Sequence, residues 1–476
     1  MSDPVPEVPP PEAPPSAEDD HRLYAGRKQI YVRSISGYFT NWRWALVWLT
    51  QIIFYGLPWL TWNDRQAVLL HIVERKFYIF GGVFWPHDVF YLALLLIVSA
   101  YSLFFFTAIA GRLWCGYACP QTVYTEIFLW IEQKIEGDHN QRMKRDKAPM
   151  SGRKLALRAA KFSAWGLFSL WTSFTFVAYF SPLSELLAAV PTLAFGPWEW
   201  FWLLFYAAFT FLLAGVLREQ VCLFMCPYAR FQSVMFDQDT LVITYDEQRG
   251  EPRGVHRKNE DAKAAGKGDC VDCGICVHVC PTGIDIRKGL QYACIGCAAC
   301  IDACDQVMDK VGAPHGLIRY TTEHALKNKW GNKEILAHVR RPRTLVYGAL
   351  LLVVISAFIW GLATRVPLRV DIIRDRGVLG REVEDGMIEN VYQLQIMNMT
   401  EGARRFNFAV EGLEGLRVEG DNTVSIGAAE TQTFILSLRA PTSAGEPGAH
   451  KVFLTTTAED APDTRVREKT IFFFPR

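Results

Sequence analysis

Eight of the twelve cysteines lie within 35 residues and follow a spacing that is typical of iron–sulfur ligands. From Cys270 to Cys280 the intervening residues number two, two and three, and the run from Cys294 to Cys304 repeats that spacing. In two-cluster ferredoxins, three thiolates of such a run bind one cubane and the fourth binds the other. The spacing therefore predicts two [4Fe–4S] clusters. This crossover rule assigns the first to Cys270, Cys273, Cys276 and Cys304, and the second to Cys280, Cys294, Cys297 and Cys300.

Clustered cysteines have two other common uses. Structural zinc sites use pairs of the form C-x-x-C rather than a doubled triplet plus one cysteine. Disulfides require an oxidising compartment. The pattern favours clusters over both, and it therefore indicates an electron-carrying protein.

The remaining four cysteines form two pairs that are each followed by a proline, Cys115/Cys119 and Cys222/Cys226. On a continuing helix the two sulfurs of such an i, i+4 pair would face one side, about 6 Å apart along the axis. Soft thiolates suit Cu(I), a close pair can cycle to a disulfide, and four thiolates can hold another metal centre. The alternative without a function is that each cysteine serves only as a small apolar residue at a helix junction. The duplication favours a function, with these four cysteines as candidate copper-binding and catalytic thiols.

An arginine precedes each pair, Arg112 in the first copy and Arg218 in the second. Each pair also closes an apolar segment, so the two copies predict an internal repeat of two helical hairpins. A nearby cation would lower the pKa of a thiol. The same arginines are equally explained as anchors at the cytoplasmic end of a membrane span.

The composition points to a lipid bilayer, because 50% of the residues are hydrophobic and 15 are Trp. Apolar runs of the length that spans a bilayer, about 17–25 residues, occur at 44–60, 89–110, 162–180, 200–217 and 344–363. The connection between the second and third runs carries ten Lys and Arg, whereas residues 181–199 carry none. Basic connections stay in the cytoplasm. We therefore expect a cytoplasmic N-terminus, a periplasmic C-terminus and every cysteine at or beyond the cytoplasmic face of a bacterial inner membrane.

After residue 364 the pattern changes to short segments of strand length separated by Gly, Asn, Asp and Pro. Residues 392–397, 405–410, 431–438 and 451–456 alternate or bunch apolar side chains, which predicts strands. Such spacing over roughly 110 residues is typical of a β-sandwich of immunoglobulin type. This part contains no cysteine, and we expect a docking or spacer module rather than a catalytic one.

Together these features predict a multi-domain membrane protein. Its fold combines an α-helical transmembrane domain of five spans, a cytoplasmic two-cluster ferredoxin-like insert and a C-terminal immunoglobulin-like β-sandwich. In chain order we expect a disordered Pro-rich cytoplasmic N-terminus (1–40), a four-span region with both C-x-x-x-C-P endings (41–220), the cytoplasmic insert (221–342), the fifth span (343–364) and a periplasmic domain (365–476). The net charge of +1 gives no support for nucleic-acid binding.

The segment from Cys280-Pro-Thr-Gly to Ala303-Cys304-Asp305 closely resembles the CcoG family, also called FixG or RdxA, of cytochrome c oxidase accessory proteins. The resemblance extends over almost the whole chain except the Pro-rich tail, and it includes both C-x-x-x-C-P endings. It implies that the eight clustered cysteines are cluster ligands. It also implies a membrane-bound copper reductase that turns Cu(II) into Cu(I) while the cbb3-type oxidase is assembled, with oxidase assembly factors and copper donors or acceptors as partners.

Two other functions remain open from the residues alone. The protein could be an electron-transfer subunit that links quinol or a cytoplasmic donor to a respiratory complex. It could also be a scaffold or metal transporter whose clusters are structural, although its spans contain few of the ionisable residues that ion pathways need. The sequence does not identify the electron donor.

Overall fold

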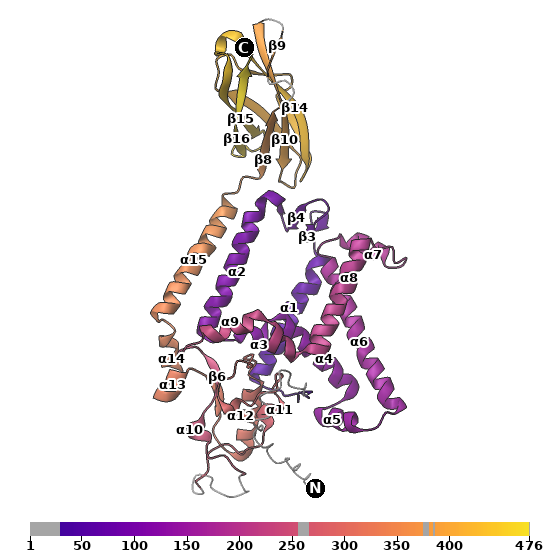
Figure 1. Ribbon diagram of the computed structural model, residues 1–476, viewed down its shortest axis with the longest axis vertical. Helices are drawn as coiled ribbons and strands as arrows, with labels where there is room; N and C mark the ends of the chain where they lie inside the picture. Colours follow the sequence, from indigo (N-terminus) through magenta and orange to yellow (C-terminus); the bar gives the residue numbers. More distant parts are fainter. Residues whose placement is uncertain (1–28, 256–265, 375–379, 384–385, 476) are drawn as a thin grey trace, which may run out of the picture. The chain divides into compact units, whose positions relative to one another are not determined.

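The computed structural model describes residues 29–255, 266–374, 380–383 and 386–475 (Figure 1). Most of the predicted disordered tail, residues 1–28, lies outside this part of the chain. Its remainder is bonded: Arg33 N donates to the carbonyl of His278 (2.9 Å), and Arg142 donates to that of Val32 (2.6 Å). The first helix then begins at Tyr38. The expected disorder of residues 1–40 is therefore wrong for residues 29–40, because their backbone groups are paired.

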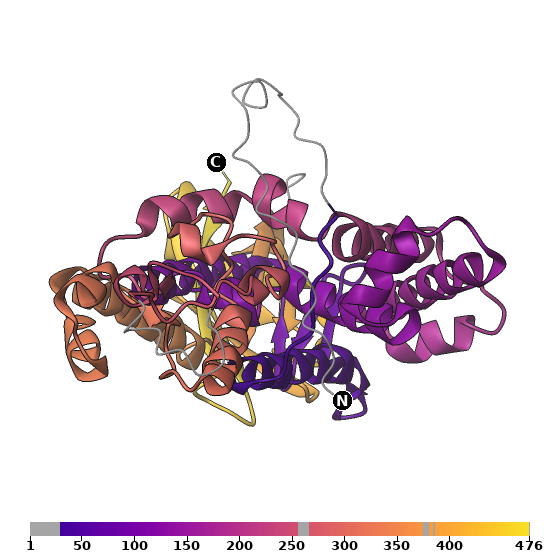
Figure 2. The same ribbon diagram turned by 90° about the horizontal axis from the view of Figure 1, so that it is seen from below.

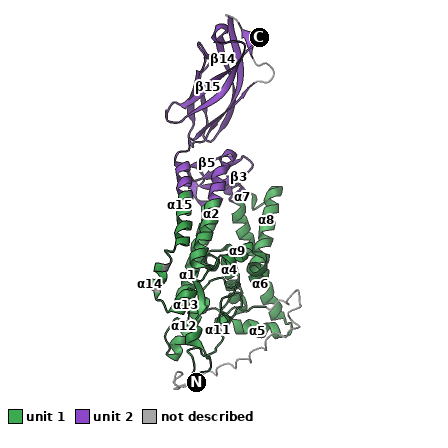
Figure 3. Cartoon of the chain, turned by 60° about the vertical axis from the view of Figure 1, so that its left-hand side comes forward, with its two compact units in different colours: residues 1–57, 97–177, 189–353 green, residues 58–96, 178–188, 354–476 purple. Residues whose placement is uncertain are grey.

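The chain forms two compact units, which Figure 3 colours separately. The first comprises Met1–Leu57, Ile97–Val177 and Ala189–Val353 and contains every cysteine. The second comprises Pro58–Leu96, Ala178–Ala188 and Val354–Arg476. Each unit draws on segments that are far apart in the sequence, so neither is a simple stretch of chain.

Long helices cover the predicted spans. They are α1 (Tyr38–Gly56), α2 (Val89–Ala110), α6 (Gly152–Val177), α8 (Pro197–Thr210) with its π-helical continuation η4 (Phe211–Leu217), and α15 (Pro342–Ala363). Three of them, Pro86–Ala110, Pro197–Leu217 and Pro342–Ala363, are long and apolar enough to cross a membrane, with mean hydropathies of 2.4, 2.0 and 2.4. Helices α1 and α6 are more diluted by Trp, Thr and Ser and are not among these three.

The apolar helices are covered by little protein. In the most apolar windows of α2 and α15, 6% and 0% of the residues are buried. Soluble monomers rarely expose so much apolar surface to water. In a membrane, lipid would cover this surface. The chain is therefore a membrane protein.

Short helices connect the long ones within the first unit. They are α3 (Leu113–Tyr117), α4 (Pro120–Glu136), α5 (His139–Lys147), η5 (Val221–Met225) and α9 (Pro227–Met235). Pro120 and Pro227 occupy the first turns of α4 and α9, where a missing N–H costs no hydrogen bond. Seen from below, α4, α5 and α6 group on one side of this unit, and the α13–α14 segment (Glu323–Asn328 and Asn332–His338) lies on the other (Figure 2).

The cysteine-rich part has little regular structure. Strands β6 (Val242–Tyr245) and β7 (Ile318–Thr321) pair antiparallel, and between them lie α10 (Glu247–Gly250), α11 (Ile275–His278), η6 (Ile286–Lys288) and α12 (Ala299–Val311). A small core joins the strands to α12 and includes Ile243, Ile301, Met308 and Leu317. The elements are short because the positions of the cysteines determine the backbone path here, and no long apolar helix or strand face does.

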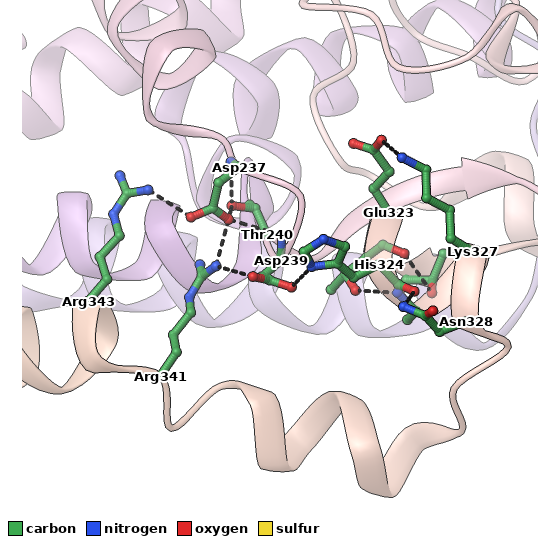
Figure 4. Close-up of polar contacts among 12 residues, drawn as sticks. Asp237, Asp239, Thr240, Glu323, His324, Lys327, Asn328, Arg341 and Arg343 are labelled. Carbon is green, nitrogen blue, oxygen red and sulfur yellow. Dashed lines mark hydrogen bonds and ion pairs between the residues drawn. The ribbon is translucent and has the colours of Figure 1, made fainter.

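A polar cluster fixes the point where the cysteine-rich part leaves the helices and α15 begins (Figure 4). Asp237 accepts hydrogen bonds from Arg341 and Arg343, both at 2.7 Å. Asp239 pairs with Arg341 (3.2 Å) and with His324 (2.6 Å). These contacts tie the entry of β6 to the start of α15, so both ends of the cysteine-rich part are anchored at one place.

The second unit is mostly β-structure. Its outer segment holds η2 (Leu57–Trp59), the pair β1 (Thr61–Trp62) and β2 (Arg65–Gln66), and a sheet in the order β3 (Val68–His71), β4 (Lys76–Ile79), β5 (Gly82–Phe84). The short helix η3 (Pro86–Asp88) follows β5, and the short helix α7 (Leu183–Ala189) follows α6. Arg365 donates to Asp88 (2.6 Å) and to the carbonyl of Val83 (2.8 Å), which joins this segment to the end of α15.

The C-terminal domain is a β-sandwich. One sheet has the order β12 (Arg417–Glu419), β14 (Thr431–Pro441), β10 (Met387–Asn398), β8 (Leu368–Arg374), with β9 (Arg381–Val383) also on β10. The other has the order β13 (Thr423–Ile426), β11 (Arg404–Glu411), β15 (Gly448–Ala458), β16 (Arg465–Phe474), and η8 (Thr442–Ala444) follows β14. Inward side chains such as Leu394, Phe406 and Phe472, each 0% exposed, fill the space between the sheets. The predicted immunoglobulin-like sandwich is confirmed.

Candidate functional site

The eight clustered cysteines line two adjoining cavities. One is bounded by the thiols of Cys270, Cys273, Cys276 and Cys304. The other is bounded by Cys280, Cys294, Cys297 and Cys300, and Cys276 reaches it too. The rest of both walls is largely apolar, with Ile, Val, Leu and Met side chains. Two thiol-lined, apolar cavities fit a pair of [4Fe–4S] clusters, and they divide the cysteines into the same sets as the spacing does.

Local backbone geometry turns these thiols inward. Gly274 and Gly296 adopt positive φ values of 64° and 70°, a conformation that glycine reaches without steric cost. Each glycine directly follows or precedes a cysteine, so the turn brings successive thiols to one side of the loop. Helix α12 then carries Cys300 and Cys304, one for each cavity.

Three thiols of the cavities, those of Cys276, Cys294 and Cys304, would keep their protons without a bound cation. Burial raises the pKa of Cys276, of Cys294 and of Cys304 to about 12 in each case. Arg287 opposes this effect at Cys276. A thiolate in such surroundings needs a metal to supply the missing positive charge, because ligation and deprotonation are coupled.

The two proline-terminated pairs have equivalent places in the repeat. Cys115 lies in α3 and Cys119 immediately precedes α4. Cys222 lies in η5 and Cys226 immediately precedes α9. Neither pair sits on a regular α-helix that continues through it, since α3 ends at Tyr117, two residues before Cys119, and η5 ends at Met225, one residue before Cys226. The facing of both sulfurs to one side, which a continuing helix would give, therefore does not apply, and a new helix starts at each proline.

The structure brings the four thiols into one electrostatic neighbourhood. Burial raises the pKa of Cys115 to about 12 and that of Cys222 to about 11, and Cys119 adds to both effects. Burial likewise raises the pKa of Cys119, with a further contribution from Cys226. Among the described residues, no three His, Cys, Asp or Glu side chains lie close enough to hold one metal ion. The four thiols are thus neighbours without being drawn around a single point.

The two arginines differ in what they do. Arg112 lowers the pKa of Cys115, as expected of a nearby cation, but burial outweighs it. Arg218 instead donates to Glu132 at 2.8 Å. Glu132 is 3% exposed and also pairs with Arg142 (3.2 Å) and Lys161 (3.6 Å). Arg218 therefore belongs to a buried ion cluster that joins α4, α5, α6 and the end of the fourth predicted span, which the sequence pattern did not indicate.

The first pair packs directly on the second set of clustered cysteines. A Cβ atom on Gly116 would lie 2.8 Å from the carbonyl carbon and oxygen of Gly296, so only glycine permits this approach. Arg112 donates to the carbonyls of Tyr292 and Ala229, which bridges the cluster loop and the second pair's helix. Cys115 and Cys222 both pack against an apolar group that includes Cys297. The bonding of Arg112 and the contact of two glycines carry no spacing signal, and sequence reasoning missed them.

Asp302 links the cluster helix to α1. Its carboxylate accepts hydrogen bonds from the backbone N–H groups of Phe39 (3.1 Å) and Thr40 (2.7 Å) and from the Thr40 hydroxyl (2.7 Å). These N–H groups belong to the first turn of α1, where a helix has no internal acceptor for them. Asp302 lies between Cys300 and Cys304, so the first helix is held by the cluster loop itself.

Three family models match the chain. The 4Fe-4S dicluster domain matches residues 217–323, a 4Fe-4S binding domain matches residues 92–137, and the IG-like fold at the C-terminal of FixG matches residues 358–475. The second match contains Cys115 and Cys119. The chain therefore carries iron–sulfur domains of the [4Fe–4S] type.

Similar proteins cover most of the chain. Protein RdxA of Cereibacter sphaeroides is 40% identical over 87% of this chain and 90% of its own length. Protein RdxB of the same organism is 39% identical over 94% and 97%. The nitrogen fixation protein FixG of Rhizobium meliloti is 38% identical over 84% and 83%.

Proposed function

The chain belongs to the family of RdxA, RdxB and FixG, and from this premise we propose that it reduces Cu(II) to Cu(I) for the assembly of a cbb3-type cytochrome c oxidase. Iron–sulfur binding and electron transport follow from the domains. Copper as the substrate is our own step. It rests on the four thiols beside the second cysteine set, since soft thiolates prefer Cu(I).

Within this proposal the ligands follow the two cavities. Cys270, Cys273, Cys276 and Cys304 hold one cluster, and Cys280, Cys294, Cys297 and Cys300 hold the other. When bound, each cluster supplies a one-electron carrier. The apolar walls exclude water from the thiolates, and burial together with hydrogen bonds to sulfur sets the potential.

The contact of the glycines Gly116 and Gly296 is the observation that carries the proposal. It leaves no room for a side chain between the cluster loop and α3, and so it keeps Cys115 next to the second cysteine set. Cys115, Cys119, Cys222 and Cys226 would draw together around Cu(II), which would gain one electron from a bound, reduced cluster and become Cu(I). Binding would release the protons of Cys115 and Cys222, which burial otherwise retains.

The proposed arrangement in the membrane has five spans, with α1 and α6 added to the three most apolar helices. Many of the large apolar side chains of α1 are exposed, including Trp48 (63%) and Ile52 (65%), as in a helix that faces lipid. With the basic connections inside, the cysteines lie at the cytoplasmic face and the sandwich in the periplasm. Clusters then form in a reducing compartment.

The test is anaerobic reduction of Cu(II) by the purified full-length protein, whose clusters are first reduced with dithionite and which is then freed of dithionite by gel filtration, with a Cu(I)-specific chelator as readout. Cys115→Ser is expected to abolish the reaction while about eight iron atoms per chain remain, as two [4Fe–4S] clusters require. Met225→Leu is the matched control, because Met225 adjoins Cys226 and is 56% exposed. An unchanged rate in Cys115→Ser would contradict the proposal.

A further inference from the structure

A large cavity lies within the first unit, between α1, α4, α6 and the segment that precedes α1. Its volume is about 710 Å³, within the range of sites that bind small organic molecules. Neither the cluster ligands nor the four paired thiols line it. It is therefore separate from the site described above.

The walls of this cavity are chiefly apolar and aromatic. Trp44, Trp48, Tyr55, Trp130 and Phe168 all contribute. Trp48 and Trp130 are 63% and 48% exposed, so one side of the cavity opens where α1 and α4 present apolar surface. A ligand with a flat ring and an apolar tail could enter from lipid through this side, because aromatic walls stack on flat rings.

Two residues that line the cavity each carry a buried polar atom without a hydrogen-bond partner. Among the described residues, Oε1 of Gln51 and Nε of Arg43 have no hydrogen-bond partner. Both residues line the cavity, and Arg43 is 6% exposed. Its guanidinium is fixed by Glu126 at 2.7 Å. Unpaired buried polar groups are costly, and a rotation of these side chains toward the cavity would let a ligand pair with them and recover that cost. A donor on Arg43 and a donor–acceptor amide on Gln51 match a molecule that carries carbonyl or hydroxyl oxygens.

The cavity also reaches the second cysteine set. Val279 and Ala299 line it. Val279 immediately precedes Cys280, and Ala299 lies between Cys297 and Cys300. Thus the backbone that carries the ligands of one cluster forms part of the wall, so a molecule in the cavity would sit beside that cluster.

We propose that this cavity binds the head group of a membrane quinone or hydroquinone, and that the hydroquinone is the electron donor. The inference rests on the proposed function, whose donor it supplies. Oxidation of the hydroquinone to the quinone releases two electrons and two protons. Bound clusters would accept these electrons one at a time, and the protons would leave to water at the end where Arg33 and Ser34 are exposed.

A second apolar cavity offers an internal comparison. It is lined by α1, α2 and α3 residues that include Trp42, Leu46, Phe106 and Trp114. None of its described lining residues has a buried side-chain N or O atom without a partner. It fits a lipid chain, which needs no hydrogen bonds, rather than a quinone head group.

The experiment is photoaffinity labelling of the full-length protein in lipid nanodiscs with an azido-ubiquinone, followed by mass spectrometry. Within the segment 126–131 every residue except Phe128 lines the first cavity, and none lines the second. Within the segment 98–106 six residues line the second cavity, and none lines the first. We expect the label on 126–131, and we expect excess decylubiquinone to remove it. Label confined to 98–106, or label that decylubiquinone leaves in place, overturns the proposal.

Variants of α1 test the chemistry of the site. Gln51→Leu is expected to raise the decylubiquinone concentration for half-displacement about tenfold, the effect of losing one hydrogen bond. Ile52→Trp, which fills the cavity mouth from a residue 65% exposed, should abolish specific labelling. Ile53→Trp is the matched control, since Ile53 is 50% exposed and does not line the cavity. If Gln51→Leu and Ile52→Trp both label like the unaltered protein, the cavity holds only a lipid chain and the proposal fails.

The two proposals fail separately. Dithionite reduces the clusters without using the cavity, so Cu(II) reduction by protein that was reduced with dithionite and then freed of it tests the copper step alone. Labelling by the azido-ubiquinone needs no copper and tests the cavity alone. Finally, decylubiquinol should reduce the clusters, seen as a paramagnetic signal at low temperature, in the Ile53→Trp protein and not in Ile52→Trp. Equal reduction in both would also overturn the assignment of the donor site.

Discussion

The cysteine-rich part and the β-sandwich stabilise themselves by different means. The longest element of the former is α12, with 13 residues, and its small core includes Cys270, with Cys276 and Cys300 packed against it. The sandwich has strands of up to 12 residues, a core from two facing sheets and no cysteine. A chain segment that buries little apolar surface needs another source of free energy, and metal ligation is one. We infer that one region folds around its cofactors and the other folds from apolar burial alone.

The largest effect should come from removing a cluster ligand. We predict that Cys300→Ser prevents binding of the second cluster. Because the small core then loses the cofactor that it packs around, we expect residues 270–304 to unfold locally. Backbone hydrogen exchange there should accelerate on the order of 100-fold. Peptides from β10 in the sandwich should keep their protection. Hydrogen exchange measured by mass spectrometry, together with iron analysis, checks both regions at once. Equal acceleration in both regions would contradict the inference that only the cysteine-rich part folds around its cofactors.

A substitution in the core of the sandwich should have the opposite effect, a loss of domain stability without a loss of iron. Phe406 is 0% exposed in its core, so Phe406→Ala should lower the free energy of unfolding of this domain by about 3–5 kcal/mol. Iron content should not change. Ile435→Ala is the control, because Ile435 is 76% exposed, and it should cost less than about 0.5 kcal/mol. Thermal unfolding followed by circular dichroism measures both. Loss of iron in Phe406→Ala would show that the two regions do not fold independently.

A third change addresses how the cysteine-rich part is seated. Gly116→Ala places a Cβ atom 2.8 Å from backbone atoms of Gly296, and neither backbone can yield easily. We expect a loss of about 1–3 kcal/mol from overpacking and an altered paramagnetic spectrum of the second cluster. The control is Gly166→Ala in α6, where a Cβ atom meets nothing within 4 Å. An unchanged spectrum in Gly116→Ala would mean that the contact does not position the cluster loop.

The same two regions show what sequence reasoning can reach. The predicted strands 392–397, 405–410, 431–438 and 451–456 fall within β10, β11, β14 and β15, because alternation of apolar side chains follows directly from a half-buried strand. The two sets of thiols that the cysteine spacing assigned to clusters line the two cavities, with Cys276 lining both, and their binding of clusters stays a prediction. The strands between Thr61 and Phe84 were not predicted, since they are only two to four residues long.

Contacts between distant segments were also beyond the sequence. The approach of Gly116 to Gly296 and the bonding of Asp302 to α1 join residues about 180 and 260 positions apart, and no local period marks them. Gly296 within C-x-x-C gave the one available signal, since a glycine in a ligand loop often marks a close backbone approach. The place of Arg218 in a buried ion cluster could not be separated from an anchoring role by charge pattern alone.

The smallest predicted effect concerns the bond between the cluster helix and α1. Asp302→Ala removes the acceptor for the half-buried Phe39 N–H and for the buried Thr40 N–H. Loss of such an N-terminal cap costs about 1 kcal/mol. The substitution would thereby loosen α1, a helix outside the cysteine-rich part, which hydrogen exchange of residues 38–42 can detect. No such effect on a distant helix is expected from substitutions in the sandwich.

Asp309 provides the matched control for this change. It lies on the same helix, and its carboxylate pairs with the exposed ring of His315 (2.5 Å). Asp309→Ala should therefore leave exchange at residues 38–42 unaltered, because a solvent-exposed ion pair contributes little. If Asp302→Ala and Asp309→Ala behave alike, α1 is held by its own packing. In that case the cysteine-rich part stabilises no element beyond its own loops, and its dependence on cofactors would be local.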